Sequence, residues 1–295
     1  MTTYSSNQQH LIAPATLQAA LDAWVAAQTD GLLERMPVEL RPETQLILAS
    51  ALAVRTTWRL HFHEYPRRLD GSEVPYRWLS RQDADLDSLR WYQTPAAGPL
   101  TVVTVAGTGD VDVLLVAGEP DRSRTDVLSA ALTSLDGSSV SSQELLTGQV
   151  APAVTVIDSM SPIPQVVLSM PYFEVDAEHD LLRQAEALGL VSASDTTRGH
   201  LPGLSPMPLA VDQAKQAVMA RFSATGFEAA AVTAMAVAPG SAPQISGKCL
   251  LVDLTRPFGF LAIHRPTGIP VVLGWVAADA FSPSVKAATG GSTFH

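Results

Sequence analysis

The chain has 295 residues, of which 46% are hydrophobic and 16% are charged. This is the composition of a folded globular protein, and it excludes a disordered chain. The formal net charge of −10 and the pI near 5.1 argue against nucleic-acid binding, which needs clustered basic residues. The single cysteine, Cys249, excludes an internal disulfide and a cysteine-based zinc site.

The sequence gives no sign of membrane insertion or export. No apolar run approaches the ~20 residues that a helix needs to cross a bilayer. The start, "MTTYSSNQQH", lacks the positive charge and the apolar stretch of a secretory signal. We therefore expect no membrane partner, and the chain as written encodes no export signal.

The first 62 residues contain a polar start and two apolar segments. Residues 1–13 are polar and are predicted to be loose. Apolar residues recur at helical spacing after Pro14, and Gly31 is a stop signal, so a helix is predicted over 14–29. The apolar run 43–62 fits a buried helix or a buried strand, and its periodicity does not separate the two.

The middle of the chain mixes helices and strands. Residues 63–89 are polar and predict a connection with at most one short strand. Two β-type runs, 100–107 and 111–120, are joined by a Thr-Gly-Asp turn, which predicts a hairpin. Residues 124–135 are predicted to form a short helix. The Ser-, Gly- and Gln-rich segment 137–150 is predicted to be a flexible connection.

The second half is richer in strands. Residues 165–175 predict a strand, 178–190 a helix that ends at a glycine, and 210–222 another strand. Three further strand-like runs follow near the end of the chain, at 249–254, 258–264 and 269–277. Strands in clusters with helices between them predict an α+β fold.

Two short patterns imitate binding motifs without completing them. His61 and His63 alternate along an extended segment, but only Glu64 stands beside them as a further ligand type. Gly107 and Gly109 form an isolated GxG with no helix start after it, which is typical of a hairpin turn rather than a phosphate site.

An acidic run imitates a calcium loop. Asp83, Asp85 and Asp87 match the first ligand positions, but the sixth position is Ser88 instead of glycine and the twelfth is Thr94 instead of glutamate. No G-x-S-x-G motif surrounds any serine. The sequence therefore predicts no metal, no cofactor and no catalytic residue, and it does not indicate an enzyme.

The stretch "TGFEAAAVTAMAVAPGSAP", 225–243, is long, rich in small side chains and ambiguous between helix, strand and loop. By composition alone it reads as an alanine-rich surface loop. With the tail "VDLTRPFGFLAIHRPTGIPVVLGWV" it resembles the hinge and C-terminal signature of the serpins, the serine-protease-inhibitor family. The residues that carry this resemblance are Gly226, Glu228, Ala229, Ala230, Ala231, Thr233, Pro257, Phe258, Thr267, Gly268 and Gly274.

Three other segments resemble the family in the same order. "LDAWVAAQTDGLL" looks like a serpin helix, and "LILASALAVRTTWRLHF" looks like a strand of the central sheet, with Trp58 and Phe62 at its aromatic positions. "VVLSMPYFEVDAEHDLLRQAEALGL" matches a strand with Pro171 and Phe173 followed by a helix. The resemblance thereby favours a strand over 43–62.

The resemblance implies a serpin-like α+β fold. It has a large, mostly antiparallel central sheet, a second C-terminal sheet or barrel, surrounding helices and an exposed reactive loop. We expect one such domain over 14–281, incomplete at its N-terminal end because the family's first helices and strands have no counterpart here, and a flexible tail over 282–295. The resemblance also implies that the protein is a monomer, that its partner is a serine protease and that it is located outside the cell. The many Ala and Arg residues suggest a bacterial source.

The resemblance further implies a mechanism. A serpin's exposed loop is cleaved by a protease, and its hinge end then enters the central sheet as an extra strand. Small side chains at Gly226, Ala229, Ala230, Ala231 and Thr233 suit such an entry. Strand alternation would turn Phe227 toward the core and Glu228 toward solvent.

The hinge departs from the family pattern. Phe227 stands where serpins have a small side chain, and Ala224 stands near the place of an acidic residue. Overpacking by such a ring costs about 1–3 kcal/mol, which would slow the first step of insertion. Phe227, Ala224 and the missing N-terminal block motivate an alternative: a non-inhibitory relative that serves as a binding or storage module or as a protease substrate.

The sheet-opening region and the reactive bond also depart from the pattern. Ser50 and Gln216 stand where the family has Asn and His. The spacing from the hinge glycine places the reactive bond at Gly240–Ser241, with Ser246 or Lys248 as alternatives. A glycine before the bond suggests an elastase-like enzyme, with a subtilisin-like enzyme as the alternative. Lys248 would suit a trypsin-like enzyme.

Overall fold

The computed structural model describes residues 14–42, 44, 47, 54–134, 139–195, 197–198, 203, 209–227 and 247–284. The contacts of the chain group into two compact units, 1–53 with 176–219 and 54–175 with 220–295. The boundaries fall inside two strands, after Val175 and after Met219. The expectation of one domain over 14–281 stays a prediction. The loose start 1–13 and residues 285–295 of the predicted tail lie outside the described residues.

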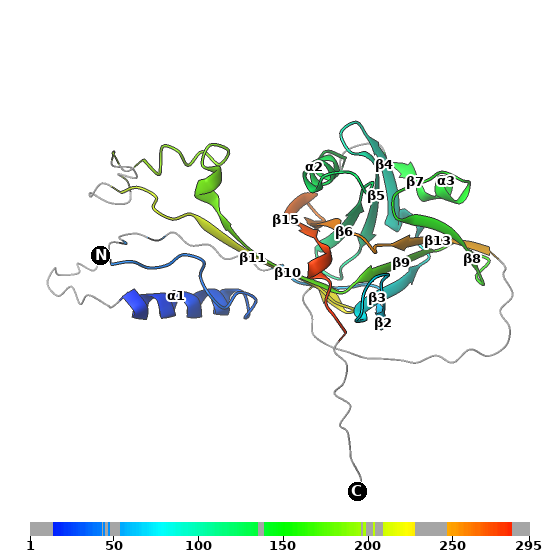
Figure 1. Cartoon of the computed structure of the whole chain (residues 1–295), viewed down its shortest axis with the longest axis horizontal. Helices are drawn as coiled ribbons and strands as arrows, with labels where there is room; N and C mark the ends of the chain where they lie inside the picture. Colours follow the sequence, from blue (N-terminus) through cyan, green and yellow to red (C-terminus); the bar gives the residue numbers. More distant parts are fainter. Residues whose placement is uncertain are drawn as a thin grey trace, which may run out of the picture. The chain divides into compact units, whose positions relative to one another are not determined.

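The first unit contains the predicted N-terminal helix, α1 (Pro14–Gln28) (Figure 1). It ends as the sequence predicts, because Gly31 takes a positive φ of 82° and its N–H donates to the carbonyl of Ala26 at 2.7 Å. No helix within the described ranges is long and apolar enough to span a membrane.

The helix predicted over 178–190 is wrong. The preceding strand, β10 (Phe173–Asp180), continues through its first residues, and a short 3-10 helix, η2 (Leu181–Gln184), follows it. The Asp180 side chain accepts from the Leu182 N–H and caps η2, and Gly189 turns the chain with a φ of 69°. Capping chemistry therefore marks a short turn here and not a full helix.

A six-stranded sheet in the second unit has the order β15-β14-β6-β5-β4-β7. Its strands are β4 (Leu89–Thr94), β5 (Gly98–Val105), β6 (Val111–Ala117), β7 (Val140–Ser141), β14 (Phe258–His264) and β15 (Ile269–Val276). The predicted β5–β6 hairpin is confirmed, with Val105 paired with Val113. Helix α2 (Arg124–Ser134) packs its buried residues Val127, Ala130 and Ala131 against this sheet.

A five-stranded sheet in the same unit has the order β2-β3-β9-β13-β8. Its strands are β2 (His63–Arg67), β3 (Tyr76–Asp83), β8 (Val154–Ser159), β9 (Val166–Pro171) and β13 (Gly247–Asp253). The predicted connection over 63–89 is therefore wrong, since it forms the antiparallel pair β2–β3 and the 3-10 helix η1 (Leu86–Ser88). The predicted connection over 137–150 contains β7 and the helix α3 (Ser142–Leu146), while residues 135–138 lie outside the described part.

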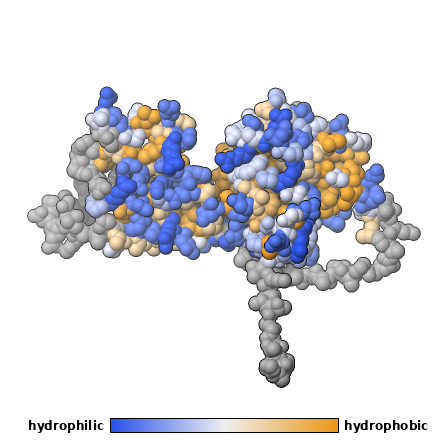
Figure 2. Space-filling view, in the orientation of Figure 1, coloured by the Kyte–Doolittle hydropathy of each residue, from blue (hydrophilic) through white to orange (hydrophobic). Residues whose placement is uncertain are grey.

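A four-stranded sheet has the order β1-β12-β11-β10. Its strands are β1 (Thr56–Thr57), β10, β11 (Lys215–Phe222) and β12 (Gly226–Phe227). Most of the segment that the resemblance favours as a strand, 43–62, lies outside the described residues before Val54. The main core joins the three sheets around a set of large aromatic rings: Trp58, Phe62, Phe173, Phe222, Phe227, Phe258 and Phe260. Hydrophobic side chains also remain exposed on both units in the view of Figure 2.

Candidate functional site: the hinge strand

Strand β12 lies between two other strands of the four-stranded sheet. It pairs antiparallel with β1 through Thr56–Phe227 and Thr57–Gly226, and with β11 through Phe222–Phe227. It has only two residues, yet both of its edges are occupied. The hinge glycine and the residue after it therefore already form a middle strand of this sheet.

A tight turn connects β11 to β12. The Ser223 N–H and the Ser223 hydroxyl both donate to the Gly226 carbonyl, each at 2.9 Å. The Gly226 N–H in turn donates to the Ser223 Oγ at 3.2 Å. Ser223 is 6% exposed, so these bonds form in a low-dielectric interior where they fix the turn firmly.

The aromatic segment after β1 closes over this turn. The Trp58 N–H donates to Thr225 O at 2.9 Å, and the Phe62 N–H donates to Ala224 O at 2.8 Å. The Trp58 indole Nε1–H donates to Ser223 O at 2.9 Å. Every carbonyl from Ser223 to Gly226 thus has a partner, and two aromatic residues from a distant part of the sequence determine the path of the hinge.

Phe227 points into the core, as strand alternation predicts, and is 2% exposed. Its ring centroid lies 6.1 Å from that of Phe260, and the Trp58 and Phe222 ring centroids lie 4.5 Å apart, tilted by 30°, within the same cluster. The core therefore has room for this ring, at the last residue before segment 228–246. In this conformation the Phe227 ring is already buried in the core.

The opposite side of β1 contacts the end of the β5–β6 hairpin. Trp58 forms an isolated bridge with Gly107, and the Arg59 guanidinium donates through Nε to Gly107 O at 3.0 Å. A Cβ on Gly107 would lie 2.1 Å from both Thr56 Oγ1 and Val111 O. Only glycine permits this close approach, which explains Gly107 of the GxG pattern without a phosphate.

An ion pair stabilises the same contact. Arg265 donates to both carboxylate oxygens of Asp112, at 2.8 and 2.6 Å, and to Gly107 O at 2.8 Å. Burial acts to raise the pKa of Asp112, but the hydrogen bonds from Arg265 and the Gly107 N–H and the charges of Arg265 and Arg59 outweigh it. The pKa of Asp112 therefore lies below its usual value.

The structure brings together Trp58, Gly226 and Phe227 from the set that the sequence predicts for the hinge and sheet opening. Gln216 is exposed on β11, in the part of that strand that belongs to the first unit. The remaining predicted residues lie outside the described ranges: Ser50, Glu228, Ala229, Ala230, Ala231, Thr233, Gly240, Ser241 and Ser246. The reactive bond and the insertion residues after Phe227 stay predictions.

Lys248, the third candidate for the reactive bond, is described. It is the second residue of β13 and pairs with Asp158 of β8. Its backbone is part of the antiparallel ladder between β13 and β8, and β9 pairs with the other edge of β13 from Leu250 onward. A protease needs a peptide it can draw into its own cleft, so this position disfavours Lys248.

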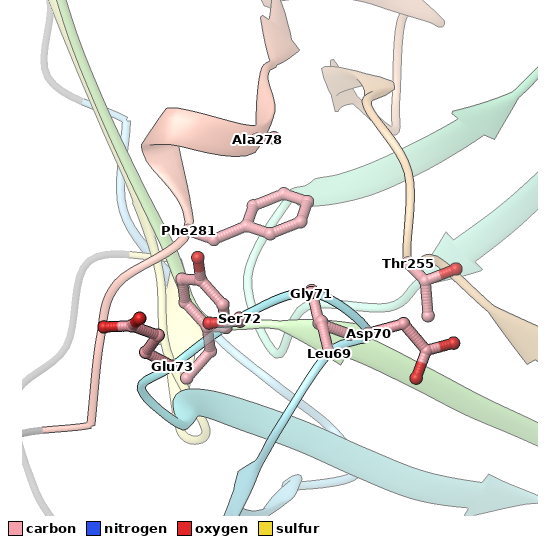
Figure 3. Close-up of a pocket in the computed structure, with 9 residues that line it drawn as sticks. Leu69, Asp70, Gly71, Ser72, Glu73, Thr255, Ala278 and Phe281 are labelled. Carbon is pink, nitrogen blue, oxygen red and sulfur yellow. The ribbon is translucent and has the colours of Figure 1, made fainter.

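A shallow pocket of about 380 Å³ opens elsewhere in the second unit (Figure 3). Leu69, Asp70, Gly71, Ser72, Glu73, Tyr76, Thr255, Ala278 and Phe281 line it. In Figure 3 the carboxylates of Asp70 and Glu73 lie on opposite sides of the Phe281 ring and do not converge. Across the described ranges no three His, Cys, Asp or Glu residues gather as a metal site. Asp85 and Asp87 instead donate their N–H groups to the preceding aspartates as local turns.

Sequence reasoning missed Ser223, Arg59 and Asp112. Ser223 stands three residues before the hinge glycine, which is the spacing of a side-chain-capped turn, so a local signal was present. Arg59 and Asp112 carry no such signal, because Gly107 lies 48 residues after Arg59 and Arg265 lies 153 residues after Asp112.

The family model "Serpin (serine protease inhibitor)" matches residues 136–278. Three solved structures share the fold. A serpin from the trematode Schistosoma haematobium superposes with a TM-score of 0.58 at 17% identity, covering 88% of this chain and 61% of that one. Thyroxine-binding globulin in complex with thyroxine gives 0.57 at 16% identity, covering 89% and 64%.

The third structure is tengpin, a thermophilic serpin in its native state, with a TM-score of 0.54 and 15% identity. It covers 90% of this chain and 63% of that one. None of the curated proteins matches the sequence. The fold is therefore serpin-like, with three sheets and few helices, and the chain spans about three fifths of the length of these structures.

Proposed function

We propose, on the premise that this chain belongs to the serpin family, that it inhibits a serine endopeptidase through cleavage of residues 228–246 and insertion of their N-terminal part into the four-stranded sheet. Serpins are mostly protease inhibitors rather than catalysts, and serine proteases are their general targets. In the proposed mechanism the protease cuts the segment between Phe227 and Gly247, and the hinge end lengthens β12.

The observation that carries the proposal is the position of β12. Gly226 and Phe227 pair on one side with β1 and on the other with β11. An inserting strand would continue between the same two neighbours. Each added residue would bring backbone hydrogen bonds and burial of its inward side chain, which is the driving force of strand addition.

The test is incubation of the chain with elastase-like, subtilisin-like and trypsin-like proteases, followed by denaturing electrophoresis. We expect a protease–inhibitor complex that survives SDS with at least one of them. A cut inside 228–246 should also raise the melting temperature, because the inserted segment adds contacts to the sheet. Cleavage by all three classes with neither a stable complex nor a rise in melting temperature would refute inhibition.

A non-inhibitory role is the second candidate. One of the structurally similar proteins is thyroxine-binding globulin, and its structure contains thyroxine. Ala224, which stands near the place of an acidic residue in the family pattern, motivates this candidate as well. It predicts that cutting residues 228–246 leaves the melting temperature unchanged. The same melting experiment therefore separates the two roles.

The finer assignments follow from the resemblance. We propose Gly240–Ser241 as the reactive bond, with Ser246 as an alternative, and an elastase-like or subtilisin-like enzyme as the target. We also propose that the protein acts outside a bacterial cell, as a monomer. Mass spectrometry of the cleaved chain locates the bond, since a cut after Gly240 releases a fragment that begins at Ser241.

A further inference from the structure

Residues 160–165, which we term the apolar arch, connect β8 to β9 and pass over the start of β13. Before the arch, Ser159 pairs with Gly247; after it, the Gln165 carbonyl accepts from the Leu250 N–H at 2.9 Å. The approach is close, because a Cβ on Gly247 would lie 2.2 Å from Ser161 O. The arch thus packs directly against Gly247, the first residue of β13 and the residue that follows segment 228–246.

The arch has a fixed conformation. The Ser161 N–H donates to Ser159 Oγ at 3.1 Å. Ser161 Oγ donates to Ile163 O at 2.9 Å and accepts from the Ile163 N–H at 3.2 Å. Two prolines, Pro162 and Pro164, restrict the backbone further. Binding of a partner would therefore cost little conformational entropy in the arch, because the arch is already ordered.

The arch exposes apolar side chains in an uncharged setting. Met160 is 67% exposed and Ile163 is 64% exposed, and the run from Ser159 to Val167 contains no charged residue. Such a run stands out in a chain with a net charge of −10. Exposed apolar residues on a rigid, neutral turn are typical of a protein-binding surface.

We infer that the apolar arch is a secondary docking site for the protease that cleaves residues 228–246. This inference rests on the proposed function and adds a determinant of target choice to it. The occupant follows from position: the arch touches Gly247, the residue directly after segment 228–246, so a protease bound to that segment comes near Met160 and Ile163. The contact is apolar, so the fitting partner has an apolar rim beside its active-site cleft.

The experiment compares second-order rate constants for cleavage or inhibition of the full chain and of a Met160→Ser/Ile163→Ser double variant. We expect the rate to fall about tenfold, because two exposed apolar side chains no longer become buried in the complex. The variant should keep the wild-type melting temperature, since both side chains are exposed. A free peptide with the sequence of residues 226–248 measures the rate without the arch.

The matched control is Ile269→Ser, since Ile269 is 58% exposed but begins β15 in the other sheet of this unit. We expect the wild-type rate from it. If the double variant reacts as fast as the wild type, the arch is not a docking site, while the proposed function stands. If no serine protease cleaves residues 228–246 in the intact chain, the proposed function fails and the inference fails with it.

Discussion

Phe227 illustrates what a single residue reveals only in its surroundings. From the sequence, its bulk at a position of small side chains suggests a hindered hinge. In the structure it lies 2% exposed beside Phe260, in a cluster of aromatic rings contributed by four strands and the segment after β1. Alternation gives the inward direction of the ring, but the space that receives it is created by residues far along the chain.

Trp58 gives a first prediction at this scale. Trp58→Phe keeps an aromatic ring but removes the indole donor to Ser223 O, leaving a buried carbonyl without that bond. We expect the free energy of unfolding to fall by about 1–3 kcal/mol. Urea denaturation followed by far-UV circular dichroism measures it. Trp24→Phe, at a ring that is 38% exposed, should have a smaller effect; equal losses would contradict the role of the indole bond.

Asp112 gives a prediction about pH. Its folded pKa lies below the unfolded value of about 3.9, so the Asp112–Arg265 pair contributes stability above that pH and loses it as the pH falls toward the folded pKa. Asp112→Asn should therefore lower the melting temperature at pH 7. The difference from wild type should shrink at pH 3, where the carboxylate takes up protons. A difference that is constant between pH 7 and pH 3 would contradict this linkage.

At the scale of elements, the sequence predicts well where hydrophobic periodicity is regular. The helix α1, the β5–β6 hairpin and the three C-terminal strands lie close to where the pattern places them. It fails over 63–89, where β2 and β3 carry three arginines. Arg77 is paired with Glu64 of β2, whereas Arg67 has a distant partner and donates to both carboxylate oxygens of Asp253 at 2.6 and 2.8 Å. A polar strand paired in this way carries no apolar alternation for the sequence to show.

The residues of the candidate site also differ in how far the sequence predicts them. Gly226 and Trp58 were found through motif resemblance, and the structure brings them together. Ser223 carries a local signal, since it stands three residues before Gly226. Arg59 could not be predicted, because its partner Gly107 is brought near only by the bridge between Trp58, directly after β1, and the end of a remote hairpin.

The contact between β1 and this hairpin gives an element-scale prediction. Gly107→Ala would drive a methyl group into Thr56 Oγ1 and Val111 O, two neighbours at 2.1 Å that include backbone. We expect a loss of about 1–3 kcal/mol in the free energy of unfolding. Gly109→Ala is the matched control, because nothing lies within 4 Å of the Cβ it would add. Similar melting temperatures for both variants would mean that β1 does not pack closely on Gly107.

At the scale of the whole molecule, the hinge strand and strand β13 belong to different sheets. Strand β12 ends at Phe227 in the four-stranded sheet, and β13 begins at Gly247 in the five-stranded sheet. The single cysteine, Cys249, lies in β13 and is 4% exposed. It therefore reports whether β13 stays in place when the segment before it is cut.

We predict that Cys249 reacts slowly with thiol reagents both before and after cleavage within 228–246. Burial shields the thiol and raises its pKa, so the slow reaction should become faster as the pH rises. A colorimetric thiol assay measures the rate, and the chain unfolded in urea gives the fast limit of one thiol per chain. Rapid reaction of the cleaved chain would mean that β13 leaves its sheet.

The pairing of β13 on both of its edges has a consequence for the uncut molecule. Six residues of β13 are in register with β8 and four with β9. In the proposed mechanism, residues 228–246 join β12 to this doubly paired strand, so full insertion would require a cut between the two strands. We therefore expect an intact sample to keep its capacity to react during long storage instead of converting to an inert form.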